Sequence, residues 1–394
     1  MNEGEQSIQK KLLLLIVSLF WFGQYVYIPY QTPYLASIGV ASSMIGTIVG
    51  AYGISQLILR LPVGVMADKS GRHKRFIMIG AFSSGAASIF RIIMPNGLGY
   101  LIANIFSGLA SAMWICFMIF YMSFFSREEQ QKATSKIILA NNFGMLCGFI
   151  TSTLLYDKLG MNFICTTSIA AGILGVILSL FIKERNNART SSPSTRSLLS
   201  VCLNKKLIFF SLLALIQQGI QMTTTMSFTS QIIKGLGASS FIVGLSSIIY
   251  MLSSVFWAGF ASSKLCSKKG PRFWIPFVFC VIAVYCIAVP NLHIIYLICI
   301  FQILPGMSTG ILFSHLTAQA MDGISADKKS TAMGCFQAIY AIGMTTFPLL
   351  AGNIIDFANM SAAYLTLAVI AIVGCITSIS YYLIKKPHFK KQAS

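Results

Sequence analysis

Long runs of apolar residues follow one another along almost the whole chain, and short polar segments separate them. A run of about 18 or more apolar residues is long enough to cross the hydrocarbon core of a bilayer as a helix. The pattern therefore predicts an all-α membrane protein with twelve transmembrane helices. The twelve runs lie at roughly 11–35, 43–67, 75–94, 97–124, 135–157, 161–183, 206–233, 240–262, 273–290, 292–320, 330–355 and 361–384.

Composition agrees with this pattern. Of the 394 residues, 56% are hydrophobic and only 10% are charged, which is too little charge to cover a soluble protein. The first apolar run is longer than the core of a signal peptide and no A-x-A-like site follows it, so we expect a transmembrane helix. The ten cysteines show no C-x-x-C spacing, and we expect free thiols that pack in the membrane, with no metal or cofactor.

The positive charges mark one side of the membrane. The formal net charge is +19, and most of the 29 Lys and Arg residues fall in alternate loops and at the two ends of the chain. This asymmetry predicts that both termini are cytoplasmic, and an even number of spans agrees with it. We therefore interpret the basic balance as a topology signal with some attraction to anionic lipid, and we expect no nucleic acid as a partner.

The second half of the chain repeats the first. LASIGVASSMIG, which ends at Gly46, matches IIKGLGASSFIVG, which ends at Gly244. A single offset of 199 residues relates Gly71 to Gly270, Glu128 to Asp327, Ala133 to Ala332, Gly144 to Gly343 and Asp157 to Asp356. We predict two pseudo-symmetric six-helix bundles, 1–184 and 206–394, joined by a polar cytoplasmic linker at 185–205. Parallel repeats of this kind place a substrate site between the halves.

Polar side chains are costly inside a membrane, so they should face water or one another. Gln24, Tyr27 and Gln31 share one face of the first predicted helix. A similar stripe in the second half is formed by Gln217, Gln221, Thr224 and Phe228. We predict that the two stripes are opposite walls of one substrate cavity, to which Asn104 and His315 also contribute. The alternative is that these side chains only hold helices together by hydrogen bonds.

The densest charge cluster is the short loop GVMADKSGRHKR. Its residues Gly64, Asp68, Gly71, Arg72 and Arg75 fit the pattern G-x-x-x-D-x-x-G-R-x-x-R/K between the second and third helices. Together with the twelve spans, the duplicated unit and the basic linker, this loop makes the chain resemble the major facilitator superfamily over nearly its whole length. The resemblance implies that the loop is a conformational latch between the halves.

The chemistry of the loop is compatible with such a latch. Gly64 would let another helix approach closely, and Gly71 would permit a tight turn. Asp68 can accept hydrogen bonds from backbone N–H groups at the start of a neighbouring helix, which in this family belongs to the other half, near residues 327–331. The two arginines could pair with acids of the next cytoplasmic loop or with lipid phosphate. We expect the latch to be closed when the cavity faces outside.

Drug-exporting branches of the family commonly carry an arginine where this chain has Asn104. They also carry a G-x-x-x-G-P signature in the fifth helix, where this chain has Gly144, Gly148 and then Phe149. The helix 5 pattern is thus half present and the helix 4 arginine is missing. The chain is closest in style to the drug/proton antiporter branches, but their mechanism does not transfer directly.

Few charged residues lie inside the predicted spans. All ten Asp and Glu residues fall in tails, loops or span ends. His315 is the candidate for proton coupling or substrate contact, and hydrogen-bonded packing is the alternative. Arg60 either extends to the cytoplasmic surface or contacts the coupling ion or an anion in the cavity. Arg91 is expected to meet lipid headgroups.

We therefore predict a secondary transporter of the cytoplasmic membrane that works as a monomer by rocker-switch alternating access. The neutral cavity and the half-present signature favour proton-coupled efflux of amphipathic, drug-like small molecules. The alternative is an uptake permease for a neutral or anionic nutrient, a sugar or an organic acid. Membrane enzymes need clustered His, Asp, Glu or Cys at depth, so we do not expect an enzyme.

Overall fold

The computed structural model describes residues 3–70, 72–126, 129–184, 200–325 and 328–384, and the regular elements of these ranges are all helical. Eleven helical segments are long and apolar enough to span a membrane. One of them, Lys136–Leu180, is roughly twice the length that a bilayer requires. Its backbone leaves the helical region at Gly160 (φ 71°, ψ −179°), so this segment is two helices. The predicted all-α fold with twelve crossings is confirmed.

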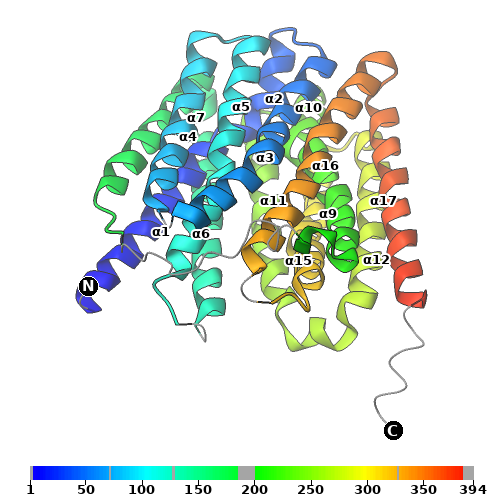
Figure 1. Ribbon diagram of the computed structural model, residues 1–394. Coiled ribbons are helices and arrows are strands. Elements are labelled where there is room, and N and C mark those ends of the chain that lie inside the picture. Colours follow the sequence, from blue (N-terminus) through cyan, green and yellow to red (C-terminus); the bar gives the residue numbers. More distant parts are fainter. Residues whose placement is uncertain (1–2, 71, 127–128, 185–199, 326–327, 385–394) are drawn as a thin grey trace.

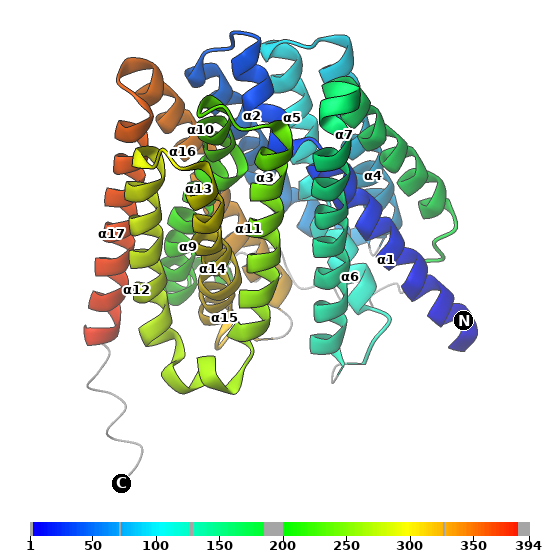
Figure 2. The ribbon, with the colours of Figure 1, turned by 180° about the vertical axis from the view of Figure 1, so that it is seen from behind.

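The helices form two bundles that lie side by side (Figures 1 and 2). The first bundle contains α1 (Glu3–Tyr25), α2 (Ile28–Ser37), α3 (Ser42–Ser70), α4 (Lys74–Ile93), α5 (Gly97–Ala112), α6 (Trp114–Met122) and α7 (Gln130–Leu180). The second contains η1 (Ser200–Leu203), α9 (Lys205–Thr223), η2 (Thr224–Phe228), α10 (Thr229–Gly235), α11 (Ser240–Ala261), α12 (Lys264–Ala288), η3 (Val289–Asn291), α13 (Ile295–Phe301), α14 (Ile303–Met307), η4 (Ser308–Leu312), α15 (Phe313–Met321), α16 (Lys329–Phe357) and α17 (Met360–Ile384).

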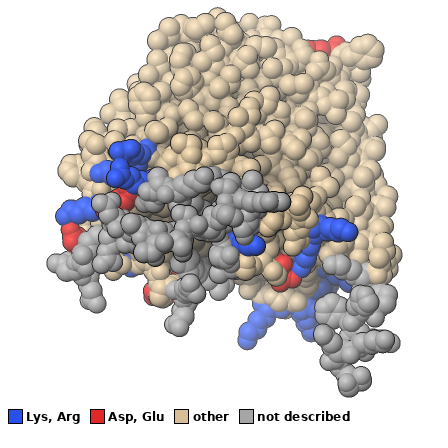
Figure 3. Space-filling view, viewed as in Figure 1, with Lys and Arg blue, Asp and Glu red and all other residues tan. Residues whose placement is uncertain are grey.

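The start of α1 and the end of α17 lie at the same end of the molecule, which we call the N/C face, and the opposite end is the far face (Figure 1). On the side viewed in Figure 3, the Lys and Arg residues gather toward the N/C face, while the far face is almost free of them. In this view, the described basic residues thus lie toward one end of the molecule. Residues 185–199 of the predicted linker lie outside the described residues.

Several crossings are interrupted near their middle. α1 ends at Tyr25 and α2 begins at Ile28. Pro29 fits the first turn of α2 because an N–H at that position would have no partner within the helix. The seventh crossing contains a π-helical turn, η2, between α9 and α10, and the tenth crossing contains a second one, η4. A π turn rotates the faces of a helix away from regular α spacing.

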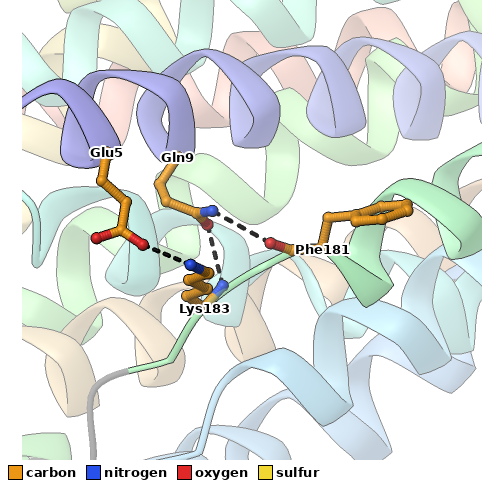
Figure 4. Close-up of polar contacts among 4 residues, drawn as sticks. All are labelled: Glu5, Gln9, Phe181 and Lys183. Atoms are coloured by element: carbon orange, nitrogen blue, oxygen red, sulfur yellow. Dashed lines mark hydrogen bonds and ion pairs between the residues drawn. The ribbon is translucent and has the colours of Figure 1, made fainter. Parts of the chain in front are cut away.

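The start of α1 is fixed to the end of α7, as Figure 4 shows. The Gln9 side chain donates from Nε2 to the Phe181 carbonyl (3.1 Å) and accepts at Oε1 from the Lys183 backbone N–H (3.0 Å). Lys183 Nζ lies 2.5 Å from a Glu5 carboxylate oxygen. These contacts connect the first and sixth crossings of the first bundle at the N/C face.

The two bundles meet most closely where α3 packs against α16. A Cβ atom at Gly50 would lie 2.6 Å from the Thr345 carbonyl oxygen, and one at Gly53 would lie 2.8 Å from the Thr345 backbone nitrogen. Only glycine lets the two backbones approach this closely. At the far face, the Asp356 carboxylate of α16 accepts hydrogen bonds from the first two backbone N–H groups of α3, at 2.9 and 2.7 Å. This carboxylate caps α3 from the other bundle.

Candidate functional site

A small cavity, partly open to the surroundings, lies between the bundles. Helices of both halves line it. The first bundle contributes Gln24, Tyr25, Tyr27, Ile28, Gln31, Val49, Tyr52 and Asn104, and the second contributes Met222 and Met226. The structure therefore brings together four residues predicted from the sequence: Gln24, Tyr27, Gln31 and Asn104.

The stripe on α1 and α2 lies on this cavity despite the break between the helices. Gln24 is 2% exposed, and its Nε2 donates to the Ser107 carbonyl (2.8 Å) and to Ser111 Oγ (3.2 Å). Its Oε1 is buried and has no hydrogen-bond partner within the described chain. Gln31 is also 2% exposed, and its Oε1 likewise lacks a partner there. Both glutamines thus line the cavity, and both amide oxygens are buried.

Arg91 lies directly behind this wall. Its side chain is 1% exposed, so the expectation that it meets lipid headgroups is wrong. It donates to Asn104 Oδ1 (2.8 Å) and Ser107 Oγ (3.0 Å), and its guanidinium carbon lies 3.6 Å from the centre of the Tyr27 ring. These partners are all neutral. An arginine does lie beside position 104, but it comes from α4, which the sequence pattern did not reveal.

The stripe on α9 is directed into its own bundle. Gln217 Nε2 donates to Gln221 Oε1 (3.0 Å), and Gln221 Nε2 donates to the Tyr250 hydroxyl (2.7 Å). Thr224 and Phe228 are completely buried, and the Thr224 hydroxyl donates to the backbone of its own helix. None of these four predicted residues lines the cavity. Gln217 and Gln221 precede the π turn η2 and are bonded to Ser308 and Tyr250 of their own bundle. The π turn changes the face only of the residues after it begins, such as Phe228.

Met222 and Met226 take their place on the cavity wall. The sequence contained a signal for them, because the offset of 198 residues that relates Gly39 to Gly237 also relates Gln24 to Met222 and Ile28 to Met226. All four of these side chains line the cavity.

His315 and Arg60 lie elsewhere. His315 Nε2 is 3.3 Å from Cys266 Sγ on α12, and the histidine is not among the cavity-lining residues. Arg60 is 5% exposed, so it does not extend to the surface. It donates to the Tyr340 hydroxyl at 2.6 Å and therefore connects α3 to α16 of the other bundle.

The predicted latch is only partly within the described residues. The side chain of Asp68, all of Gly71 and most of the predicted partner segment 327–331 lie outside them. Arg72 and Arg75 are exposed. No atom lies within 4 Å of a Cβ placed on Gly64, so the expected close approach of another helix at this glycine is absent from the described structure.

The described part of the loop is bound to its own bundle. The Glu184 carboxylate accepts hydrogen bonds from the backbone N–H groups of His73 and Lys74, which caps the start of α4. Lys74 Nζ donates to the carbonyls of Leu180 and Ile182, at 2.7 and 2.8 Å. The sequence pattern did not predict this capping role for Glu184.

On the far-face side, further hydrogen bonds join the two bundles. The Tyr30 hydroxyl donates to the Ser240 carbonyl (2.8 Å), and the hydroxyls of Thr32 and Ser227 are 3.0 Å apart. Figure 2 agrees, because α7 and α11 converge toward this face. No group of three or more His, Cys, Asp or Glu side chains in the described ranges could hold a metal ion.

Comparison with known proteins places the chain among transporters. The family model of the Major Facilitator Superfamily matches residues 13–328 and 275–394. An uncharacterized MFS-type transporter of Methanocaldococcus jannaschii is 23% identical over 393 residues, 96% of this chain and 100% of its own length. The quinolone resistance protein NorA of Staphylococcus aureus is 24% identical over 195 residues, 47% of this chain and 48% of NorA. A crystal structure of a mutant of the nucleoside transporter NupG shares the fold, with a TM-score of 0.75, 15% identity, and coverage of 95% of this chain and 100% of that one.

Proposed function

The chain belongs to the Major Facilitator Superfamily, and from this premise we propose that it carries a small amphipathic molecule across the membrane by alternating access. The observation that carries the proposal is the cavity between the bundles, because residues of both halves line it. The bonds of Tyr30, Thr32 and Asp356 join the bundles on the far-face side. Breaking them while closing the N/C face would move the bound molecule from one side to the other.

The proposed orientation places both termini in the cytoplasm, and a monomer is sufficient for the proposed mechanism. The Lys and Arg residues near the N/C face support this orientation (Figure 3). In this orientation the far face is the outer surface, so the described conformation has its bundles joined on the outside. The predicted latch of Asp68 would then form only in the opposite conformation.

For the direction, we propose export in exchange for protons. NorA, which is similar over half of the chain, is named as a quinolone resistance protein, which is compatible with efflux. The two glycines of the half-present drug-export pattern lie against the first crossing, since a Cβ at Gly148 would be 3.1 Å from the Val26 nitrogen. His315 is the proposed titratable group within a span.

Uptake of a neutral or anionic nutrient is the second candidate. Arg60 and Arg91 are both buried in the membrane and form no ion pair with a described carboxylate. A buried positive charge without a counter-charge favours a neutral or anionic solute over a cation. The structural neighbour NupG is named as a nucleoside transporter, a name that also fits uptake.

Reconstituted proteoliposomes with an imposed pH gradient would test the proposal. We expect flux of an amphipathic probe against its own gradient, which an uncoupler abolishes, and a strong reduction in Asp68→Asn. Lys264→Gln, at the exposed start of α12 in the other bundle, is the matched control. Gradient-independent flux of a sugar or an organic acid would favour uptake, and unchanged flux in Asp68→Asn would remove the latch from the mechanism.

A further inference from the structure

We propose that the start of α12 binds the headgroup of an anionic phospholipid, with Lys269 and Arg272 as the bases that contact its phosphate. The site lies on the outer side of the second bundle, apart from the cavity, and the inference does not depend on the identity of the transported molecule. Three observations support it: a fixed bend in α12, exposed bases without a described counter-charge, and an apolar stripe that leads along the helix to these bases.

The first turns of α12 form a bend at the N/C face (Figures 1 and 2). The backbone leaves the helical region at Gly270 (φ 68°, ψ 179°), a conformation that favours glycine, and Pro271 begins the next helical piece. Trp274 Nε1 donates to the Cys266 carbonyl at 3.0 Å and so connects the two pieces across the bend. The bend therefore holds residues 264–269 in a fixed position beside the start of the membrane crossing.

The bases of this bend have no acid beside them. No Asp or Glu occurs between residues 184 and 322 of the sequence. Lys206, at the start of α9, pairs with Asp322, whereas Lys269 and Arg272 are exposed and form no ion pair with a described carboxylate. A guanidinium donates two hydrogen bonds to a phosphate, and an amine near the membrane surface attracts anionic lipid. An anionic headgroup would supply the charge that the chain itself does not provide here.

An exposed apolar stripe runs along α12 from these bases into the membrane. Its members are spaced three or four residues apart and therefore share one helical face. They are Phe273, Phe277, Cys280, Val284 and Ile287. The stripe rises by about 21 Å, more than the roughly 15 Å of hydrocarbon in one leaflet.

The stripe and the bases lie on the same side of the helix. Lys269 Nζ is 4.3 Å from the centre of the Phe273 ring, and Phe273 is the first member of the stripe. Arg272 is exposed and directly precedes Phe273 in the chain. A phospholipid whose acyl chains pack along the stripe therefore places its phosphate beside these two bases.

The other two bases of the bend provide an internal comparison. Lys264 and Lys268 are one helical turn apart, on the face of the first piece opposite the buried Cys266. They therefore point away from the bundle, whereas Lys269 lies over Phe273. A specific site predicts unequal roles for the two pairs of bases, and a general attraction to positive charge predicts equal roles.

Native mass spectrometry of the purified protein in detergent tests the ligand class. Phosphatidylglycerol and phosphatidylcholine with identical acyl chains are titrated separately, and glycerol 3-phosphate is added as a free headgroup. We expect the first phosphatidylglycerol to bind about tenfold more tightly than the first phosphatidylcholine, and we expect an equal concentration of glycerol 3-phosphate not to displace it. Equal affinities of the two lipids, or displacement by glycerol 3-phosphate, would overturn the proposal.

Paired variants locate the site. Lys269→Gln combined with Arg272→Gln should lower the preference for phosphatidylglycerol from about tenfold to about twofold or less. Lys264→Gln combined with Lys268→Gln removes the same charge from the same bend and should keep the preference above about fivefold. All four side chains are exposed, so both double variants should melt at the temperature of the wild type. Equal losses of preference in the two double variants would leave only a general attraction and would refute the site.

Discussion

The two polar stripes, one in each half of a duplicated chain, differ in where their hydrogen bonds go. On the first crossing, Gln24 and Gln31 line the cavity, and their amide oxygens are buried without a partner in the described chain. On the seventh, Gln217 and Gln221 bond to each other and Gln221 bonds on to Tyr250, away from the cavity. Duplication therefore preserved the position of the helices, while one stripe lines the cavity and the other packs within its own bundle.

Among these variants, removal of Arg91 should have the largest effect on the cavity wall formed by the first stripe. Arg91→Leu leaves Asn104 Oδ1 and Ser107 without their charged donor and removes the stacking on Tyr27. We expect a loss of roughly 3 kcal/mol in the free energy of unfolding, and weaker ligand binding because the wall loses its support. Thermal denaturation in detergent measures the first effect. Arg75→Leu, at an exposed position, is the control, and equal melting temperatures for both variants would contradict the role of Arg91.

A matched pair of glutamine variants should separate the two stripes. Gln217→Leu removes a donor from Gln221 and Ser308 and should lower the free energy of unfolding by about 1–2 kcal/mol, with ligand affinity unchanged. Gln31→Leu should keep the stability of the wild type or exceed it, because it removes an unsatisfied buried acceptor. Melting temperatures and binding isotherms on the same samples would measure the stability and the ligand affinity of both variants. The reverse pattern would show that the second stripe is the binding wall.

Removal of the charge on Asp356, which caps α3 at the far face, should have the smallest of these effects. Asp356→Asn keeps the shape of the side chain but removes the charge that faces the start of α3. The expected loss is about 1 kcal/mol, comparable to other helix caps, and it should appear only in conformations with the far face joined. Asp322→Asn, whose carboxylate pairs with Lys206 inside the second bundle, is the control for conformational effects. If both variants change transport rates equally, the cap does not act between bundles.

The fold could be predicted because it depends on features that a sequence carries directly. Twelve long apolar runs and the repeat of residues such as Gly39 and Gly237 define the crossings and the two bundles. The first stripe was also predictable, because Gln24, Tyr27 and Gln31 keep a shared face across the break before Pro29.

The remaining parts of the site depend on geometry that regular spacing does not contain. The predicted face of Gln217, Gln221, Thr224 and Phe228 assumed an uninterrupted α-helix, which the π turn η2 interrupts before Phe228. Gln217 and Gln221 precede this turn, and their bonds to Ser308 and Tyr250 depend on packing that spacing does not contain. The prediction for Arg91 was wrong because it used only the position of this residue near the end of α4. That position does not reveal which face of α4 packs against α5. The capping of α4 by Glu184 joins residues more than 100 positions apart in the chain, a contact that no local pattern predicts.

The close packing of α3 on α16 at Gly50 and Gly53 also limits how this gene can vary. A glycine codon is one base change from codons for alanine, serine, valine or a charged residue, and every one of these products adds at least a Cβ. Each added Cβ would clash with the Thr345 backbone and would prevent α3 from packing closely against α16. Selection for a working protein should therefore remove most single-base variants at these two codons, while neighbouring codons for lipid-facing residues drift freely.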